Sequence, residues 1–283
     1  MLRAFFSSYT NGVLVKSCPL CHHNDSRPKY KIEDFDIVQC RDCGFVYLNH
    51  EIETRDEELN YEMYFESTTL DDYTDDSEDI NIQQARLINS TRLHWVQSRH
   101  PQGRLLDVGC GRGFFLKHAI DAGYEVEGVE LSVSAAQYAT EHFNVPVHVS
   151  NLEHERAFSN EYDVITLWHV LEHFHQPVTV LQNLWTMLAP GGTLYVEVPN
   201  LNSVKFRLSA PGTRWQGGNH PRYHRSFFTQ DTLQRALRHA GYIDLQHRSI
   251  LYPVQKNPMM RGVKRLLQLY HLDSFLQMEA NAR

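Results

Sequence analysis

The chain has 283 residues, of which 42% are hydrophobic and 22% charged, proportions typical of a globular protein with one substantial core. It has no run of 18 apolar residues, and its opening residues lack the apolar length and cleavage site of a signal peptide. We therefore expect a cytoplasmic protein without a transmembrane segment, and the net charge of -7 disfavours nucleic acid as a partner.

Residues 1–50 contain two C-x-x-C pairs, formed by Cys18, Cys21, Cys40 and Cys43. In a chain without an export signal, this spacing indicates metal binding rather than disulfides. Two such pairs can hold one structural Zn2+ through four thiolates, so we predict a small zinc-ribbon module over residues 1–50, with loss of the metal as the alternative. Basic and acidic residues are balanced, five to five, between residues 16 and 43, so the module has no basic patch.

Residues 51–80 hold thirteen acidic residues and one arginine, with little apolar periodicity. This composition predicts a linker or a lid, in which Tyr61 and Tyr64 of "NYEMYFE" are candidates to cover a ligand, with simple packing as the alternative.

Strand-like and helix-like patterns alternate from residue 81 to residue 250. The predicted helices are 81–100, 114–122, 132–143, 178–188 and 229–242, the last with Thr229 as its N-cap. The predicted strands are 104–108, 124–130, 145–150, 162–168, 193–199 and 243–250. This order predicts an α/β fold with a doubly wound, mostly parallel sheet.

Gly109, Gly111 and Gly113 lie between a predicted strand and a predicted helix. Glycines allow a tight turn there, and the free N–H groups at the start of the helix favour a negative ligand group. Glu130 ends the next strand, where a carboxylate can accept both hydroxyls of a ribose. We predict a cofactor site, with a tight turn that binds nothing as the alternative. Cys110 is interpreted as a small residue that fits the turn.

The pattern D-x-G-x-G-x-G from Asp107 to Gly113 resembles the first motif of class I S-adenosylmethionine-dependent methyltransferases. "VEGVELS" resembles their second motif, and "YDVITLWHVLEHFHQP", "LAPGGTLYVEVPN" and "HRSFFTQDTLQRALRHAGY" resemble later segments, in order over residues 85–250. The resemblance implies a Rossmann-like methyltransferase domain, which we delimit at 81–250. A dehydrogenase usually has the spacing G-x-G-x-x-G, whereas this chain has G-x-G-x-G.

By this resemblance, S-adenosylmethionine is the cofactor, the glycine turn holds its methionine part and Glu130 binds its ribose. Leu131 is expected to flank the adenine, with Asn151 and Leu152 at the adenine edge. The residues implied in cofactor binding are Asp107, Gly109, Cys110, Gly111, Gly113, Glu130, Leu131, Asn151, Leu152, Trp168 and His169.

His169, Glu172 and His173 spell H-x-x-E-H, which is a zinc-peptidase signature when it lies inside a helix. Here the preceding "YDVITLW" predicts a strand, so these side chains are expected at the rim of a pocket beyond its carboxyl end. His169 is then a candidate to contact cofactor or substrate. Glu172 and His173 either line this pocket or only brace the local turn.

A second cluster of His220, Tyr223 and His224 lies in "GGNHPRYHRSFF". In zinc-ribbon methyltransferases that modify nucleotide-linked sugars, a Glu-His pair precedes a similar aromatic segment. His224 matches that histidine, but Tyr223 replaces the glutamate, which puts a carbon-methylating mechanism in doubt. We predict His224 as the catalytic base, assisted by Tyr223, with His169 as a second candidate and a packed loop histidine as the alternative.

Residues 251–283 are predicted to form a C-terminal amphipathic helix and tail. Val263, Leu266, Leu267 and Tyr270 share one helical face, which predicts docking on the chain's own body or on the twin subunit of a homodimer, with a membrane surface as the alternative. The family's sheet usually ends with a seventh strand, and "MEANAR" does not resemble one, so we expect an unusual or truncated sheet edge.

The leading hypothesis is methyl transfer to a small polar acceptor, a sugar, nucleotide-sugar or glycan precursor, on oxygen or carbon. The ribbon is expected to cover the substrate side of the domain. Trp215 and Arg222 are candidates to hold a sugar ring and a phosphate, or else are core and surface residues. The alternatives are an RNA or protein methyltransferase that uses the ribbon as a reader, and a non-catalytic scaffold that binds only the cofactor.

Overall fold

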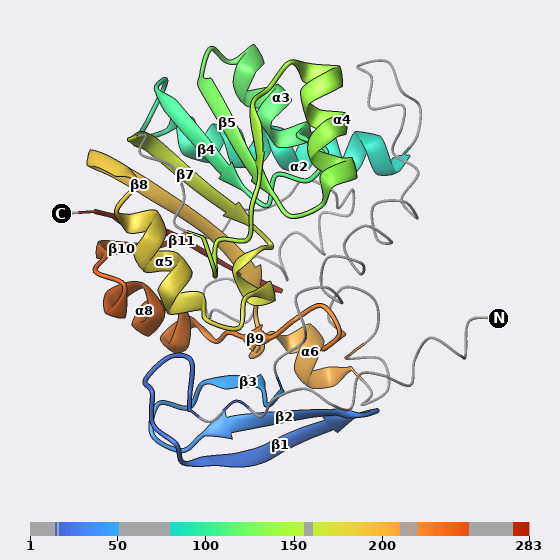
Figure 1. Ribbon diagram of the computed structural model, residues 1–283, viewed down its shortest axis with the longest axis vertical. Coiled ribbons are helices and arrows are strands. Elements are labelled where there is room, and N and C mark those ends of the chain that lie inside the picture. The colour runs from blue at the N-terminus through green and yellow to red at the C-terminus, as the bar shows by residue number, and fades with distance from the viewer. Residues whose placement is uncertain are drawn as a thin grey trace.

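The computed structural model describes residues 15, 17–50, 80–155, 161–209, 215, 220–248 and 274–282, which form two sheets and their flanking helices (Figure 1). Within these ranges, no helix is both long and apolar enough to cross a bilayer. The predicted acidic segment (apart from residue 80), Tyr61 and Tyr64 in it, and the predicted helix with Val263 and Tyr270 lie outside them.

The larger sheet has the strand order β10-β11-β8-β7-β4-β5-β6. Its strands are β4 (Arg104–Val108), β5 (Glu125–Glu130), β6 (Val147–Val149), β7 (Tyr162–Trp168), β8 (Leu188–Pro199), β10 (Ile243–Arg248) and β11 (Phe275–Asn281). Strands β4 to β8 pair in parallel, and β11 is antiparallel to both of its neighbours. The predicted doubly wound, mostly parallel sheet is confirmed.

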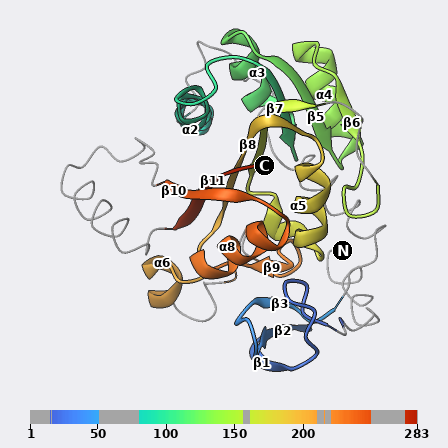
Figure 2. The ribbon, with the colours of Figure 1, turned by 90° about the vertical axis from the view of Figure 1, so that its left-hand side faces the viewer.

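Helices cover both faces of this sheet, and Figure 2 shows α2 and α5 on either side of the strands. The helices are α2 (Ile80–Gln97), α3 (Phe114–Asp121), α4 (Val133–Phe143), the 3-10 helix η2 (Leu171–His173), α5 (Pro177–Trp185), α6 (Val204–Leu208) and α8 (Gln230–His239). Successive strand residues point to opposite faces, so Leu105 packs in the core under α2 and α3, whereas Leu106 packs in the core under α5 and α8. Thr229 caps α8 as predicted, since its hydroxyl accepts the N–H of Thr232.

Two predictions about the sheet are wrong. The C-terminal residues are not a tail, because Phe275–Asn281 form β11. This strand lies between β8 and β10 and is the seventh strand of the sheet. Leu188 does not end a helix, because α5 stops at Trp185 and Leu188 already begins β8.

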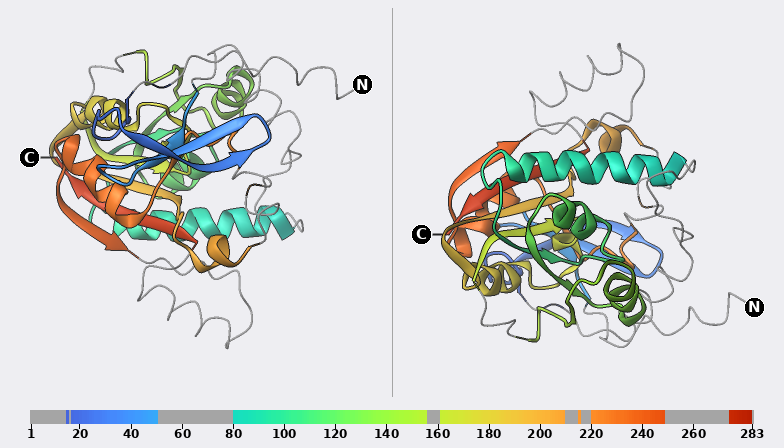
Figure 3. Two further views of the ribbon diagram at one scale, coloured as in Figure 1. Left: turned by 90° about the horizontal axis from the view of Figure 1, so that it is seen from below. Right: turned by 90° about the horizontal axis from the view of Figure 1, so that it is seen from above.

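The smaller sheet joins the N-terminal residues to the rest of the chain. Its order is β1-β2-β3-β9, with β1 (Ser26–Ile32), β2 (Phe35–Cys40), β3 (Val46–Leu48) and β9 (Ser226–Phe227). Figure 3, in the view from below, shows β1 and β2 stretched across this end of the molecule. The ring of Phe45 lies 5.3 Å from that of Phe228, inside the core that also contains α8. The predicted ribbon therefore shares its core with the larger domain.

Candidate active site

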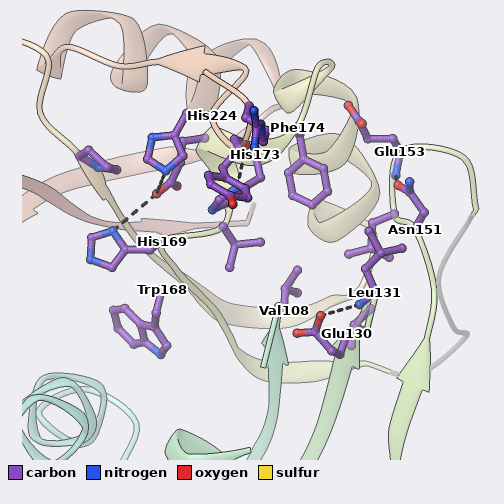
Figure 4. A pocket seen from close by; sticks show the side chains of 18 of the residues that line it. Val108, Glu130, Leu131, Asn151, Glu153, Trp168, His169, His173, Phe174 and His224 are labelled. Atoms are coloured by element: carbon purple, nitrogen blue, oxygen red, sulfur yellow. Dashed lines mark hydrogen bonds and ion pairs between the residues drawn. The ribbon is translucent and has the colours of Figure 1, made fainter. Parts of the chain in front are cut away.

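A pocket of about 890 Å³ opens at the carboxyl ends of β4, β5 and β7. Figure 4 shows Glu130, Leu131 and Asn151 on one side of it and His169, His173 and His224 on the other. Of the predicted site residues, those that line the pocket are Gly109, Glu130, Leu131, Asn151, Leu152, Trp168, His169, Tyr223 and His224. Segments far apart in the sequence therefore meet at the predicted edge of the sheet.

The glycine turn and Glu130 form one wall of this pocket. Gly109, Gly111 and Gly113 all have positive φ angles, of 67°, 54° and 78°, which residues with side chains rarely adopt. The backbone N–H of Gly111 donates to Glu130 Oε2 at 2.7 Å, and the N–H groups of Leu131 and Ser132 donate to Oε1. This end has the bare backbone and the fixed carboxylate that a nucleoside-containing cofactor requires.

Four of the predicted cofactor residues are not among those that line the pocket, namely Asp107, Cys110, Gly111 and Gly113. The Asp107 carboxylate accepts the Thr166 hydroxyl at 2.6 Å, and its burial raises its pKa to about 7. The Cys110 thiol packs against Gly128, and its burial raises its pKa well above the usual range, so it is no reactive thiolate. The structure thus gives Asp107 and Cys110 supporting positions behind the glycine turn.

His169 follows β7 directly and has a left-handed backbone with φ of 61°. Its Nε2 lies 3.0 Å from the Glu197 carboxylate and its Nδ1 3.5 Å from that of Glu172. Burial alone would lower the pKa of His169, but the two carboxylates outweigh this effect and raise it to about 9. Because both nitrogens face carboxylates, this environment favours the protonated imidazole and makes His169 a less suitable base than His224, so its predicted catalytic role stays a prediction.

Glu172 lies at the centre of the histidines, and its side chain is 1% exposed. Neither carboxylate oxygen has a hydrogen-bond partner among the described residues, and His224 Nε2 lies 3.9 Å from Oε1. The nearby imidazoles outweigh burial and lower the pKa of Glu172, whereas burial lowers that of His224 to about 3. The pocket thus contains a buried carboxylate beside an unprotonated imidazole.

The H-x-x-E-H residues do not form a peptidase site, because they lie at the end of a strand and in a single 3-10 turn rather than in a long helix. Glu172, His173 and His224 do bring one potential ligand atom each to within 4.8 Å of one another, a set that can hold a metal ion. His173 Nδ1 bonds the Tyr223 carbonyl at 2.9 Å, which joins η2 to the 220–225 turn.

The 220–225 turn carries the second predicted cluster into the pocket. His220, Arg222, Tyr223 and His224 all line it. Trp215 does not bind a sugar ring there, since it is 4% exposed and its ring packs 5.2 Å from those of Tyr30, Phe206 and Phe227. Its suggested role as a stacking platform is wrong, and the core alternative is correct.

Several lining residues were not predicted from the sequence, and Glu33 and Phe275 are two of them that come from distant segments. Glu33 comes from the tip of the β1–β2 hairpin, and the Phe275 ring lies 4.6 Å from that of His169. No local motif marks either residue. Recognising the last strand would have pointed to Phe275, and the expectation that the ribbon covers the substrate side could have been extended to Glu33.

The four N-terminal cysteines converge at one point. The Sγ atoms of Cys18 and Cys43 lie 3.6 Å apart, as do those of Cys21 and Cys40, and all four lie within 4.8 Å of one another. In a tetrahedral site with Zn–S bonds of about 2.3 Å, the sulfur–sulfur distance is about 3.8 Å. The geometry therefore fits a four-thiolate zinc site.

Comparisons with known proteins agree with the fold. The family model described as "Methyltransferase domain" matches residues 81–247. Ubiquinone biosynthesis O-methyltransferases from Thiobacillus denitrificans and Ralstonia nicotianae are both 30% identical to this chain, over 54% and 58% of it and 71% and 74% of their own lengths. The matches therefore span most of each relative.

Solved structures show the same fold at lower identity. A methyltransferase from Mesorhizobium loti aligns with a TM-score of 0.52 and 17% identity, covering 69% of this chain and 99% of that one. The plantazolicin methyltransferase aligns with a TM-score of 0.53 and 15% identity, covering 81% and 96%. Because the family model matches more than half of the chain, this protein belongs to the methyltransferase domain family and is a class I S-adenosylmethionine-dependent methyltransferase.

Proposed function

We propose that this enzyme transfers the methyl group of S-adenosylmethionine to a hydroxyl group of a small polar molecule. One observation carries the proposal: Glu130 lines one end of the pocket and His224 the other (Figure 4), where Glu172 lies 3.9 Å from His224. The names of the relatives at 30% identity, which are O-methyltransferases, favour oxygen as the methylated atom. The acceptor class includes the sugars and nucleotide sugars considered above, as well as the phenolic compounds that the ubiquinone pathway of those relatives implies.

We assign the cofactor to the end of the pocket lined by Gly109 and Glu130. Glu130 is proposed to bind the ribose, Leu131 to lie on the adenine, and Asn151 and Leu152 to contact the adenine edge. Bound there, the cofactor supplies a methyl group on a positively charged sulfur, so no further activation of the leaving group is needed. The protein has to orient the acceptor in line with that bond and accept its proton.

His224 is the proposed proton acceptor. It is unprotonated throughout the physiological range, because burial holds its pKa at about 3. The imidazolium that forms when it takes the proton lies beside the Glu172 carboxylate, 3.9 Å away, which stabilises it. An attacked hydroxyl becomes strongly acidic as the new O–C bond forms, so even this weakly basic imidazole can take the proton. Tyr223 lines the same wall as a hydrogen-bonding group.

The proposal includes a structural Zn2+ held by Cys18, Cys21, Cys40 and Cys43, supported by their sulfur spacing. It retains the ribbon over residues 1–50 and extends the catalytic domain from the predicted 81–250 to include β11. Because the ribbon shares a core with α8, the metal is expected to stabilise the whole chain and not one separable module.

The test is incubation of the zinc-loaded full chain with methyl-labelled cofactor and a panel of nucleotide sugars and catechols, with products identified by mass spectrometry. Calorimetry should give cofactor binding in the micromolar range. The variant His224→Gln should lower kcat by about 10²–10⁴-fold with little change in cofactor affinity. His148→Gln, whose imidazole pairs with Glu127 outside the pocket, is the control. Cofactor binding without transfer to any acceptor would contradict the proposed function and favour the scaffold alternative.

A further inference from the structure

The tip of the ribbon's first hairpin reaches the pocket. Glu33 lies in the turn between β1 and β2, has a left-handed backbone with φ of 51°, and lines the same pocket as Glu130 and His169. Its Oε2 lies 3.8 Å from Nε2 of His220, which belongs to the 220–225 turn. One carboxylate from the ribbon and one imidazole from the catalytic domain therefore face each other at the pocket wall.

The neighbouring backbone determines which nitrogen of His220 carries the proton. The N–H of Arg222 donates to His220 Nδ1 at 3.1 Å, so Nδ1 acts as an acceptor. Burial lowers the pKa of His220, which leaves the imidazole neutral, with its single proton on Nε2. This nitrogen is the one nearest to Glu33, but its distance of 3.8 Å from Glu33 Oε2 is too long for a good hydrogen bond. The pair thus offers one donor and one acceptor to a third group.

A hydroxyl group fits this arrangement better than an ammonium, carboxylate or phosphate group does. It can accept from His220 Nε2–H and donate to the Glu33 carboxylate at the same time. An ammonium group has no lone pair with which to accept the imidazole proton. A carboxylate or phosphate would be repelled by Glu33.

His220 is held in place by packing, whereas the Glu33 side chain at the hairpin tip is 66% exposed. The ring of Phe35, which is buried, lies 5.7 Å from the His220 ring in an edge-on contact. The Leu48 N–H donates to the Arg225 carbonyl at 2.8 Å, and β3 pairs with β9 immediately after that turn. These contacts join the 220–225 turn to β2 and β3 of the ribbon, the sheet that carries the Glu33 hairpin.

We propose that Glu33 and His220 form a second hydroxyl-binding subsite, so that the acceptor carries at least one hydroxyl besides the one that is methylated. This inference rests on the proposed function for the reacting hydroxyl, and it makes the ribbon a part of substrate selection. Polyhydroxylated acceptors such as sugars and catechols are selected over molecules with a single hydroxyl.

The test measures binding rather than turnover. Calorimetry or ligand-observed NMR is carried out on the zinc-loaded full chain saturated with S-adenosylhomocysteine, with two probe pairs: catechol against phenol, and methyl glucoside against cyclohexanol. At least one polyhydroxylated probe should bind more tightly than its partner. Glu33→Ala should lower the affinity for that probe about tenfold, because a charge-assisted hydrogen bond is lost. The affinity for the monohydroxylated probe of the same pair should change less than twofold. The matched control is Asp34→Ala, which removes the same charge from the same turn but not from the pocket lining.

The proposal is overturned if neither catechol nor methyl glucoside binds. It is also overturned if Glu33→Ala lowers the affinity for both members of a pair equally, or if Asp34→Ala lowers the affinity for the polyhydroxylated probe as much as Glu33→Ala does. The labelled-cofactor assay separates this result from failure of the proposed function. Binding that depends on Glu33 but leads to no methyl transfer would leave the subsite intact and contradict the transfer reaction.

Discussion

Replacing Glu197 by glutamine should destabilise the protein and change the charge of His169. Glu197 is fully buried on β8, where its carboxylate pairs with Arg92 Nη2 of α2 at 2.5 Å and with His169 Nε2 at 3.0 Å, and also accepts from Gln277. The substitution removes a fully buried anion that is shared by two partly buried cations, although His169 keeps the Glu172 carboxylate 3.5 Å from its Nδ1. Breaking buried pairs of this kind costs about 3–5 kcal/mol, so we expect a loss of that size in the free energy of unfolding at pH 7.

The pH dependence gives a second readout. The pKa of His169 is raised to about 9 in the folded chain and is about 6.5 when unfolded. The stabilisation from this group is therefore fully present below pH 6.5 and is lost as the pH rises through 9. In Glu197→Gln, the pKa of His169 should fall, so the decline should still begin near the unfolded pKa of about 6.5 but should be smaller and end at a lower pH.

The measurements are urea unfolding at several pH values and NMR titration of His169. The control is Glu125→Gln, which removes an exposed carboxylate 3.4 Å from Arg104 and should cost less than about 1 kcal/mol. A loss below about 1 kcal/mol in Glu197→Gln, together with an unchanged His169 pKa, would refute the reasoning from buried charge.

Four further predictions concern the turn, a helix cap and the metal. Gly111→Leu should abolish cofactor binding in calorimetry, because φ is 54° and the side chain would enter the glycine turn; unchanged affinity would contradict the cofactor placement. Gly113→Ala should lower the free energy of unfolding by about 1–3 kcal/mol and with it the melting temperature. The reason is that φ is 78° and the new Cβ would lie 2.8 Å from that of Ala139. A Tm equal to that of the unmodified protein would contradict this. Thr229→Ala should cost about 1 kcal/mol in denaturant unfolding through loss of the α8 cap, with no change in the slope m. Chelation should remove one zinc per chain, measured by atomic absorption, and lower the Tm, whereas Cys110→Ser should retain the metal; a metal-free purified chain with the same Tm would count against the zinc site.

The glycine turn and the position of Glu130 in the pocket wall could be predicted because their signals are local. Gly109 and Gly113 need backbone conformations that follow from the sequence of a strand, a tight turn and a helix. Glu130 is found at the end of the next strand of the same unit. Each of these positions depends on contacts within about two dozen residues.

The remaining features depend on contacts between distant segments. In β11, Gln277 and Glu279 are buried, so the segment lacks the apolar pattern of a central strand. Their partners come from elsewhere, since Trp95 Nε1 of α2 donates to Glu279 at 2.8 Å. The charge of His169 likewise depends on Glu197, which no spacing rule connects to it. Sequence patterns reveal neither of these pairings.

The pairing of β3 with β9 has a practical consequence for producing the protein. Phe45 packs against Phe228, which is 1% exposed, and both share a buried core with Tyr47 and Leu233. A shortened version that begins at residue 80 would present this apolar surface to water and leave β9 as an unpaired edge, both of which promote aggregation. Recombinant expression and crystallisation should therefore keep the N-terminal residues and include zinc in the growth medium.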